Sequence, residues 1–321
     1  MTQARLMRKE KVFIDRLTKE DSKPLYELSP GAARKVLENV QKSTHSRLPD
    51  TAAETLEIET VNGRKMKTLL IRPSASQNNL PVIFYIHGGG WIMGSDTTHE
   101  RLIKTLAVES KAAVVFPVYE NTPENHFPQM TDELFSVLQN IVQNSRQLNL
   151  NTNKLVLAGD SVGGNMALTM ALMAKNNHFT PQIKFMLLLY PVAVAAFETG
   201  SYQEFADGPW LTKKAMEWFW DSYTTDPSER SSIYASPLKA SIEELHGLPP
   251  TLVITAENDV LRDEGEELAR KLDAAGTDTT SVRFNGTIHD FMMLNGLADS
   301  APSQTALLLA AAKLKQIFSA D

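Results

Sequence analysis

Short apolar runs alternate with helix-like segments from residue 82 to the end of the chain. Six runs have strand character, most of them apolar on both faces: Val82–Ile86, Ala112–Val118, Leu155–Ala158, Ile183–Leu189, Leu252–Thr255 and Thr280–Phe284. Five segments have helical character: Glu100–Glu109, Met130–Asn144, Met166–Lys175, Glu264–Ala275 with Gly276 as its C-cap, and Ser303–Phe318. Strands buried on both faces and separated by helices predict a mostly parallel central sheet with helices on both sides.

The segment before residue 82 has a different pattern. Two strand-like runs, Thr55–Glu59 and Met66–Ile71, flank Asn62-Gly63. Both central residues of a type I′ turn need positive φ, so Asn-Gly between two such runs predicts an antiparallel hairpin. The first fifty residues have mixed charge and helical character, and we expect one helix to start at Ser29-Pro30.

Composition excludes several kinds of chemistry and partner. The chain contains no cysteine, which excludes a disulfide scaffold, a cysteine nucleophile and a thiolate metal site. A net charge of −6 without Lys/Arg runs argues against nucleic acid as a partner. The longest apolar stretch, Phe185–Phe197, is shorter than the ~20 residues of a membrane span, and residues 1–19 lack a signal-peptide core. We expect a cytoplasmic protein without membrane insertion; association into a homodimer stays open.

Gly159-Asp160-Ser161-Val162-Gly163 matches the pattern G-x-S-x-G. The motif lies between the predicted strand Leu155–Ala158 and the predicted helix Met166–Lys175, where a tight turn pushes the serine into a strained, exposed position. The helix N-terminus behind the serine favours developing negative charge. The alternative is a glycine-rich turn that only caps a helix, which this strand–turn–helix setting disfavours.

A second glycine motif, His87-Gly88-Gly89-Gly90-Trp91, directly follows the strand Val82–Ile86. Consecutive glycines let backbone N–H groups converge on one point, as the tetrahedral oxyanion of acyl transfer requires. A phosphate-binding loop is the alternative, but no G-x-x-x-x-G-K-[ST] pattern occurs. Because His87 precedes the serine in the chain, we expect it to shape this loop rather than to act as the base.

A general base should follow the serine in the chain order serine, acid, histidine. Three of the seven histidines do so. His178 ends the helix behind Ser161, and His246 precedes a strand. His289 follows the strand Thr280–Phe284, at the edge where open α/β sheets place their sites. His289 is therefore the expected base.

The acid should lie between the serine and the base, just after a strand. The strand Leu252–Thr255 is followed by Asp259, the favoured candidate, with Glu257 and Asp263 as rivals. Asp263 also suits a helix N-terminus, where its charge would be stabilising. The histidines are scattered and no acidic cluster has ligand spacing, so we expect no metal site.

Four motifs in this order resemble the α/β-hydrolase esterases of the hormone-sensitive-lipase type (bacterial family IV): H-G-G-G-W at 87–91, G-D-S-V-G-G-N at 159–165, D-V-L-R-D-E-G at 259–265 and H-D-F at 289–291. The segment Tyr119–Pro128 resembles a further family segment. The resemblance implies the α/β-hydrolase fold with a helical cap. Its expected parts are cap helices in residues 1–50, a core of residues 51–194 and 248–321, and a cap insertion of residues 195–247.

The resemblance also implies specific roles. Ser161, Asp259 and His289 would form the catalytic triad. The N–H groups of Gly89, Gly90 and Val162 would form the oxyanion hole, with Gly88 supporting the loop.

Three residues depart from the family pattern. Val162 stands where alanine is usual, Glu120 where a basic residue is common, and Asp290 where glycine is usual. None occupies a triad position, and each affects what substrate shape can be expected.

Residues 195–247 concentrate aromatic side chains, including three of the four tryptophans. These rings either pack a helical insertion or form a wall over a pocket for an apolar substrate group. We expect the substrate pocket to be lined by Trp91, Asp160, Tyr190, Trp210, Phe219 and Ile288.

The expected function is hydrolysis of short- to medium-chain acyl esters through an acyl-enzyme intermediate, without cofactor or metal. The neutral base predicts activity that rises through roughly pH 6–8. One alternative is a hydrolase of the same fold that cleaves an acetyl-sugar, a lactone or an amide. Another is a ligand-binding receptor built on a dead hydrolase, which would lack a triad member.

Overall fold

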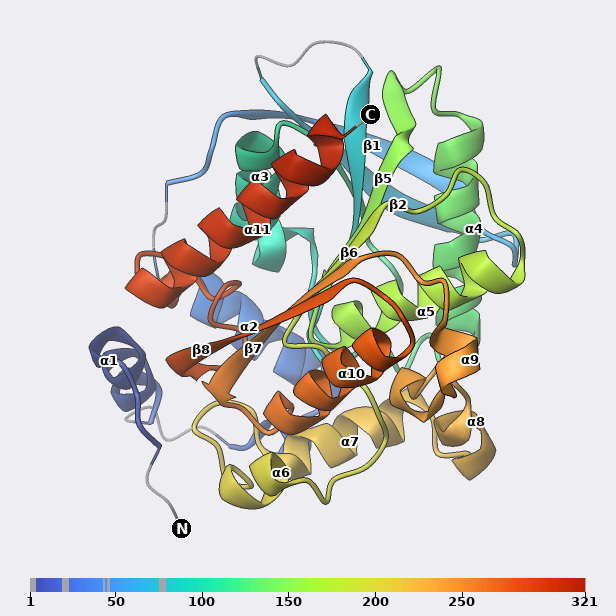
Figure 1. Ribbon diagram of the computed structural model, residues 1–321. Coiled ribbons are helices and arrows are strands. Elements are labelled where there is room, and N and C mark those ends of the chain that lie inside the picture. Colours follow the sequence, from blue (N-terminus) through green and yellow to red (C-terminus); the bar gives the residue numbers. More distant parts are fainter. Residues whose placement is uncertain (1–3, 19–22, 43, 45–46, 75–78, 321) are drawn as a thin grey trace.

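The computed structural model describes residues 4–18, 23–42, 44, 47–74 and 79–320 of the chain. In this part of the chain eight strands have the order β1-β2-β4-β3-β5-β6-β7-β8 (Figure 1). They are β1 (Thr51–Glu59), β2 (Lys65–Pro73), β3 (Leu80–Ile86), β4 (Ala113–Pro117), β5 (Leu150–Asp160), β6 (Phe185–Leu189), β7 (Thr251–Asn258) and β8 (Thr279–Ile288). Each expected strand lies in or overlaps one of them.

Strand direction follows the predicted pattern. β1 pairs antiparallel with β2, and β2 pairs antiparallel with β4. Every other neighbouring pair is parallel. At the hairpin turn Gly63 has a φ of +73°, and its N–H donates to the carbonyl of Thr60 over 2.9 Å. The predicted fold class, a mostly parallel sheet with an N-terminal antiparallel hairpin, is confirmed.

Four parallel strands end immediately before residues that the sequence singled out. β3 ends before His87, β5 before Ser161, β7 before Asp259 and β8 before His289. Carboxyl ends of parallel strands share one edge of a sheet, and open α/β sheets place their ligand sites there. The sheet therefore brings residues as far apart in the sequence as His87 and His289 to one edge.

Helices cover both faces of the sheet. The helices of the core are α3 (Asp96–Ser110), α4 (Gln129–Gln143), α5 (Val162–Asn176), α10 (Arg262–Ala274) and α11 (Ala301–Ser319). In Figure 1, α3 and α11 lie side by side on one face, and α4, α5 and α10 lie on the other. The core between these layers is fully buried; every residue of β4 and β6, for example, is buried.

Helix α5 begins earlier than the sequence predicts. Its first residue is Val162, four positions before Met166, because Gly163, Gly164 and Asn165 are helical despite their low helix propensity. Asn165 is held by tertiary contacts, since its side-chain amide donates to the carbonyls of Val192 and Ala235 over 3.1 and 3.0 Å. The early start puts a helix N-terminus directly behind Ser161.

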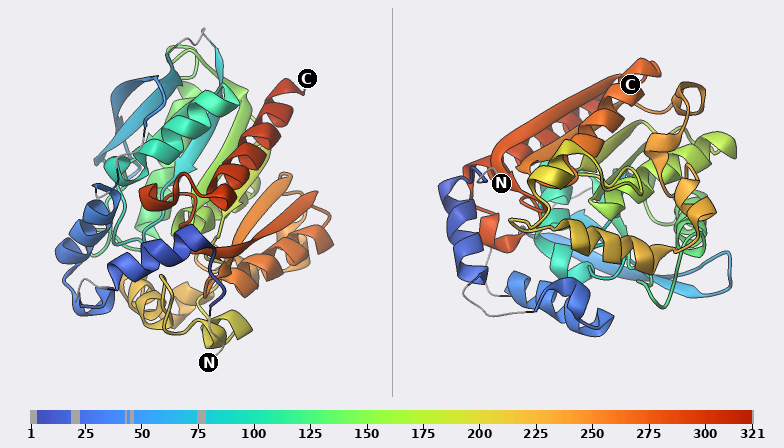
Figure 2. Two further views of the ribbon diagram at one scale, coloured as in Figure 1. Left: turned by 90° about the vertical axis from the view of Figure 1, so that its left-hand side faces the viewer. Right: turned by 90° about the horizontal axis from the view of Figure 1, so that it is seen from below.

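Two groups of short elements gather at the same end of the molecule (Figure 2). The first group is α1 (Arg8–Leu17), η1 (Leu25–Glu27) and α2 (Pro30–Lys42), and the second is α6 (Gly200–Glu204), α7 (Lys213–Tyr223), α8 (Pro227–Ser231), η2 (Pro237–Lys239) and α9 (Ile242–Leu245). Phe13 packs against Trp210 with ring centroids 5.8 Å apart, and the Lys214 ammonium lies 5.7 Å from the Tyr26 ring. The two groups therefore contact each other, and α2 starts at Pro30 as expected.

No helix in the described part of the chain combines the length and the apolar character needed to cross a lipid bilayer. A 3₁₀ turn, η3 (Asn295–Leu297), completes the elements and lies between β8 and α11.

Candidate active site

Ser161 stands on a sharp turn between β5 and α5. Its φ of 54° and ψ of −122° fall outside the regions that side-chain-bearing residues ordinarily adopt. The turn needs glycine on both sides. A Cβ on Gly159 would lie 2.3 Å from the backbone of Gly163, and a Cβ on Gly163 would lie 2.0 Å from the carbonyl oxygen of Ile86.

Three side chains from separate elements form one hydrogen-bonded chain. Nε2 of His289 lies 2.9 Å from Oγ of Ser161, and Nδ1 of His289 lies 2.7 Å from Oδ2 of Asp259. A carboxylate only accepts, so Nδ1 carries a proton; in the neutral ring Nε2 is therefore free to accept from the serine hydroxyl. Asp259 is fixed in turn, because its Oδ1 accepts from the N–H of Leu261 over 3.0 Å.

A second carboxylate contacts the same histidine. Oδ1 of Asp290 lies 3.4 Å from Nε2 of His289. Burial alone would lower the pKa of His289, but the charges of Asp259 and Asp290 outweigh it and raise that pKa from 6.5 to about 9. Burial raises the pKa of Asp290, and the histidine beside it opposes this rise.

The sequence marks position 290 only as a departure from the usual glycine. It does not predict the contact between Asp290 and His289. Asp290 has a φ of 65°, a left-handed conformation that Asp tolerates better than most residues. Its Oδ2 accepts a 3.0 Å hydrogen bond from Nε1 of Trp210, which lies in the segment expected to form the cap. This hydrogen bond connects the loop after β8, which carries His289 and Asp290, to residues 195–247.

The two rival acids have other partners. Oε2 of Glu257 accepts from the N–H of Gly286 over 2.6 Å. Oδ2 of Asp263 accepts from the N–H of Ser201 over 2.7 Å, at the start of α6. The structure brings neither of these carboxylates to His289.

The glycine loop of residues 87–90 presents two free backbone donors. Within the described residues the N–H groups of Gly89 and Gly90 bind no acceptor. Val162 is the first residue of α5, and first-turn N–H groups have no intrahelical acceptor. The N–H of Gly88 differs, since it donates to Oδ1 of Asp160 over 3.0 Å. Gly88 thus anchors the loop and has no donor left for a substrate.

His87 is packed inside this loop. Its ring stacks on Tyr119 with centroids 4.1 Å apart, and burial lowers its pKa to about 3. The neutral ring donates from Nδ1 to the carbonyl of Gly88 over 2.8 Å, and the Tyr119 hydroxyl donates to the carbonyl of His87 over 2.9 Å. These contacts agree with a role in shaping the loop.

Two residues expected to line the substrate pocket, Trp91 and Asp160, pack against other parts of the protein. Trp91 is fully buried and stacks on Tyr223 of α7 with centroids 4.0 Å apart. Asp160 is also fully buried and accepts from Tyr85 and Gly88. The structure therefore places Trp91 between the glycine loop and α7, and Asp160 against the glycine loop. Sequence reasoning missed these partners because they are far away along the chain.

Of the other four expected pocket residues, two lie beside His289, and two contact neighbouring parts of the site. The Tyr190 ring meets His289 edge-on at 5.0 Å, and Ile288 is buried at the end of β8. Trp210 is half-buried. Phe219 of α7 covers the glycine loop, because a Cβ on Gly90 would lie 2.4 Å from its ring.

The remaining departures from the family pattern lie apart from each other. Glu120 is exposed and pairs with Arg64 of the hairpin. Val162 is fully buried directly after Ser161.

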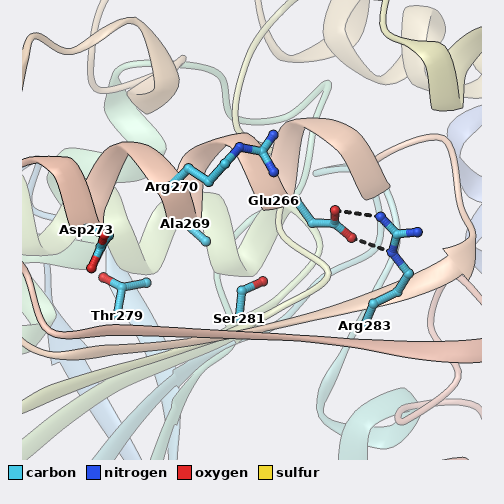
Figure 3. Close-up of a pocket in the computed structure, with 7 residues that line it drawn as sticks. All are labelled: Glu266, Ala269, Arg270, Asp273, Thr279, Ser281 and Arg283. Carbon is cyan, nitrogen blue, oxygen red and sulfur yellow. Dashed lines mark hydrogen bonds and ion pairs between the residues drawn. The ribbon is translucent and has the colours of Figure 1, made fainter.

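A hollow of about 560 Å³ lies elsewhere, between α10 and β8 (Figure 3). Its charged lining includes Glu266 and Arg283, which are joined by two hydrogen bonds of 2.6 Å. It contains no histidine and none of the expected site residues. In the described part of the chain no group of three or more histidines or carboxylates could hold a metal ion.

Among proteins with a doubly wound sheet, a serine on a strained strand-to-helix turn and a histidine delivered after the last strand distinguish the α/β hydrolases. Fold and site thus define the class. The sequence assigns the family in the same way: residues 83–293 match the family described as α/β hydrolase fold, and the chain belongs to it. The resemblance that the motifs indicated is confirmed.

Similar proteins include esterases. An Acanthamoeba polyphaga mimivirus protein assigned to the α/β hydrolases is 40% identical over 96% of this chain and 87% of its own length. An ethyl acetate hydrolase of Pseudomonas putida is 29% identical, with 90% and 91% of the two chains covered. The crystal structure of a thermostable esterase from Pseudomonas putida ECU1011 superposes with a TM-score of 0.97 at 44% identity over all of both chains.

Proposed function

We propose that this protein is a serine carboxylesterase that hydrolyses short- to medium-chain acyl esters through an acyl-enzyme intermediate. The observation that carries the proposal is the continuous hydrogen-bonded chain from Ser161 through His289 to Asp259, with spacings of 2.9 and 2.7 Å. Such a chain supplies a nucleophile, a base in reach of it, and a group that orients the base. Esterases among the similar proteins support the same activity.

The proposed reaction uses each member of this chain in turn. His289 removes the proton of the Ser161 hydroxyl as its oxygen attacks the ester carbonyl, and Asp259 stabilises the imidazolium that forms. His289 then protonates the departing alcohol, which leaves an acyl group on Ser161. Water, deprotonated by the same histidine, releases the acid and restores the serine.

Backbone donors would stabilise the tetrahedral oxyanion. The N–H groups of Gly89 and Gly90 bind no acceptor in the described structure, and Val162 adds a donor at the N-terminus of α5. Each well-aligned donor is worth about 3–4 kcal/mol in the transition state. We assign the oxyanion hole to these three groups, with Gly88 supporting the loop.

The preference for short acyl groups rests on how little room surrounds the triad. Ser161 and His289 are 4% and 3% exposed. The Phe219 ring lies against Gly90, next to one proposed oxyanion donor, so it limits the space beside the reacting carbonyl. A similar protein named for ethyl acetate hydrolysis supports a small substrate.

The cap is part of the proposal. We assign residues 1–50 and 195–247 to it. Trp210 of the second segment donates a hydrogen bond to Asp290, beside the catalytic histidine, and Phe13 of the first segment packs on Trp210. We also propose a cytoplasmic location, since a chain without cysteine needs no oxidising compartment.

The test is hydrolysis of p-nitrophenyl esters from acetate to palmitate by the wild-type chain and by Ser161→Ala. We expect kcat/KM to be highest at two to six acyl carbons, and the variant to lose roughly 10⁵–10⁶-fold of kcat. Equal, slow hydrolysis by both proteins would exclude the enzymatic proposal. A maximum at palmitate would exclude only the short-acyl preference.

A further inference from the structure

A buried carboxylate, Asp160, lies directly before the nucleophile and takes no part in the proposed reaction. It is fully buried at the end of β5. Its Oδ1 accepts from the Tyr85 hydroxyl over 2.8 Å and from the N–H of Gly88 over 3.0 Å. Its Oδ2 lies 3.1 Å from Nε2 of His99. Asp160 therefore has three donors around it, and one of them belongs to the glycine loop.

The ring of His99 is held in one orientation. Because a carboxylate only accepts, Nε2 of His99 must carry the proton that points at Asp160. Nδ1 lies 2.9 Å from the Thr98 hydroxyl, and this hydroxyl belongs to the capping box that starts α3 with Ser95. His99 itself is fully buried. The first turn of α3 thus aims the imidazole at Asp160.

These donors let the carboxylate stay charged in the protein interior. Burial would raise the pKa of Asp160, but the charge and hydrogen bond of His99 and the hydrogen bond of Tyr85 outweigh burial and hold that pKa below its usual range. An unpaired buried carboxylate would be strongly destabilising. The His99 donor is thus a condition for Asp160 to accept from the loop.

Asp160 also packs directly on the glycine loop. A Cβ on Gly88 would lie 2.4 Å from Oδ2 of Asp160 and 2.7 Å from its carbonyl oxygen. The carboxylate thus both accepts a hydrogen bond from Gly88 and packs against it. Gly89 and Gly90 follow directly, and their free N–H groups are the proposed oxyanion donors.

We propose that His99 is a positioning residue: through Asp160 it holds Gly88 and so aims the N–H groups of Gly89 and Gly90 at the oxyanion. His99 does not touch the substrate. The inference rests on the proposed ester hydrolysis at Ser161, and it adds a second histidine–aspartate pair to the site.

The first test compares His99→Leu with His99→Gln, using p-nitrophenyl acetate. The glutamine amide keeps an N–H donor near the place of Nε2, whereas leucine has none. We expect kcat to fall roughly tenfold to a hundredfold in His99→Leu, because oxyanion donors become misaligned. KM should stay within about twofold, since the lost interaction exists only in the transition state. His99→Gln should recover most of kcat.

The second readout is inhibition by an alkyl trifluoromethyl ketone, which forms a tetrahedral oxyanion with the serine. Its Ki should rise in His99→Leu by the same factor by which kcat falls. Wild-type kcat in His99→Leu would overturn the proposal. So would an equal loss in both variants with an unchanged Ki, which is the result that a merely structural role predicts. If His99→Leu fails to fold, Tyr85→Phe removes another donor to Asp160 and should give the same pattern more weakly.

A third readout separates the inference from the proposed function. If the wild-type chain hydrolyses no ester and binds no ketone, the proposed function fails. The inference still predicts that the Gly88 amide proton, bonded to a carboxylate, appears at low field in ¹H–¹⁵N spectra. It should move in His99→Leu and stay near its wild-type position in His99→Gln; an unchanged Gly88 signal in His99→Leu would overturn the inference.

Discussion

Two histidine–aspartate pairs meet at the adjacent residues Asp160 and Ser161, and they are built in opposite ways. In the first pair the carboxylate of Asp259 takes Nδ1 of His289, at 2.7 Å, which leaves Nε2 facing the serine. In the second pair the carboxylate of Asp160 takes Nε2 of His99, at 3.1 Å, and Nδ1 faces Thr98. Only the first ring has a nitrogen free to accept a proton from the nucleophile.

The comparison shows that orientation separates a base from a scaffold when the residue types are the same. His289 comes from the loop after β8 and reaches the serine, whereas His99 comes from the first turn of α3 and reaches the carboxylate. The first pair would change its protonation during the reaction, and the second would keep one arrangement throughout. Three substitutions test this difference, starting with the one expected to have the largest effect.

The largest effect is expected at the orienting acid of the first pair. Asp259→Asn should lower kcat by about 10⁴-fold, because the amide favours the wrong tautomer of His289. The matched control is Asp263→Asn, whose side chain binds Ser201 instead of the histidine, and which should keep most of the activity. Steady-state hydrolysis of p-nitrophenyl acetate measures both. A greater loss in Asp263→Asn would assign the acid to Asp263.

An intermediate effect is expected where the second pair meets the glycine loop. Gly88→Ala would place a Cβ 2.4 Å from Oδ2 of Asp160, so the loop must shift. We expect kcat to fall roughly tenfold to a hundredfold with little change in KM. In the control Gly31→Ala the new Cβ meets no atom within 4 Å, so activity should stay at the wild-type level. Unchanged kcat in Gly88→Ala would show that Asp160 does not set the position of the loop.

The smallest effect is expected from the second carboxylate beside His289. The base must be neutral, so kcat/KM should rise as pH rises through a His289 pKa of about 9, higher than the range expected from the sequence. Asp290→Asn removes a charge that favours the imidazolium and should move this rise to lower pH by roughly one unit. The new amide can still accept from Trp210, so the cap contact is retained.

A pH–rate profile of the wild type and Asp290→Asn between pH 6 and 10.5 provides the measurement. Profiles that coincide would mean that Asp290 does not influence the base. The same two proteins also test how the free energy of unfolding changes with pH. Because the folded-state pKa of His289 exceeds 6.5, its ion pairs stabilise the fold fully below pH 6.5, and this contribution disappears as pH rises through about 9.

The strands, the helices of the core and the fold class could be predicted from the sequence, because buried parallel strands leave apolar runs and Asn62-Gly63 marks the hairpin turn. Ser161 could be singled out by G-x-S-x-G between a strand and a helix, and His289 by its place after both the serine and a strand. Asp259 could be favoured over Glu257 and Asp263, and the family resemblance points to the same residue. The start of α5 could not be predicted, since Asn165 is helical through contacts with residues 192 and 235. The partners of Asp160, Trp91 and Asp290 are tertiary contacts that no local pattern encodes.

The contact between Phe13 and Trp210 has a consequence for synthesis of the protein on the ribosome. Phe13 packs on Trp210, and Trp210 donates to Asp290, so helix α1 can complete these contacts only after residues about 200 and 280 positions later have been made. Contacts of such large sequence separation slow folding, and domains fold as units when their parts are complete. The growing chain therefore has no competent esterase site until the loop that carries His289 and Asp290 has emerged.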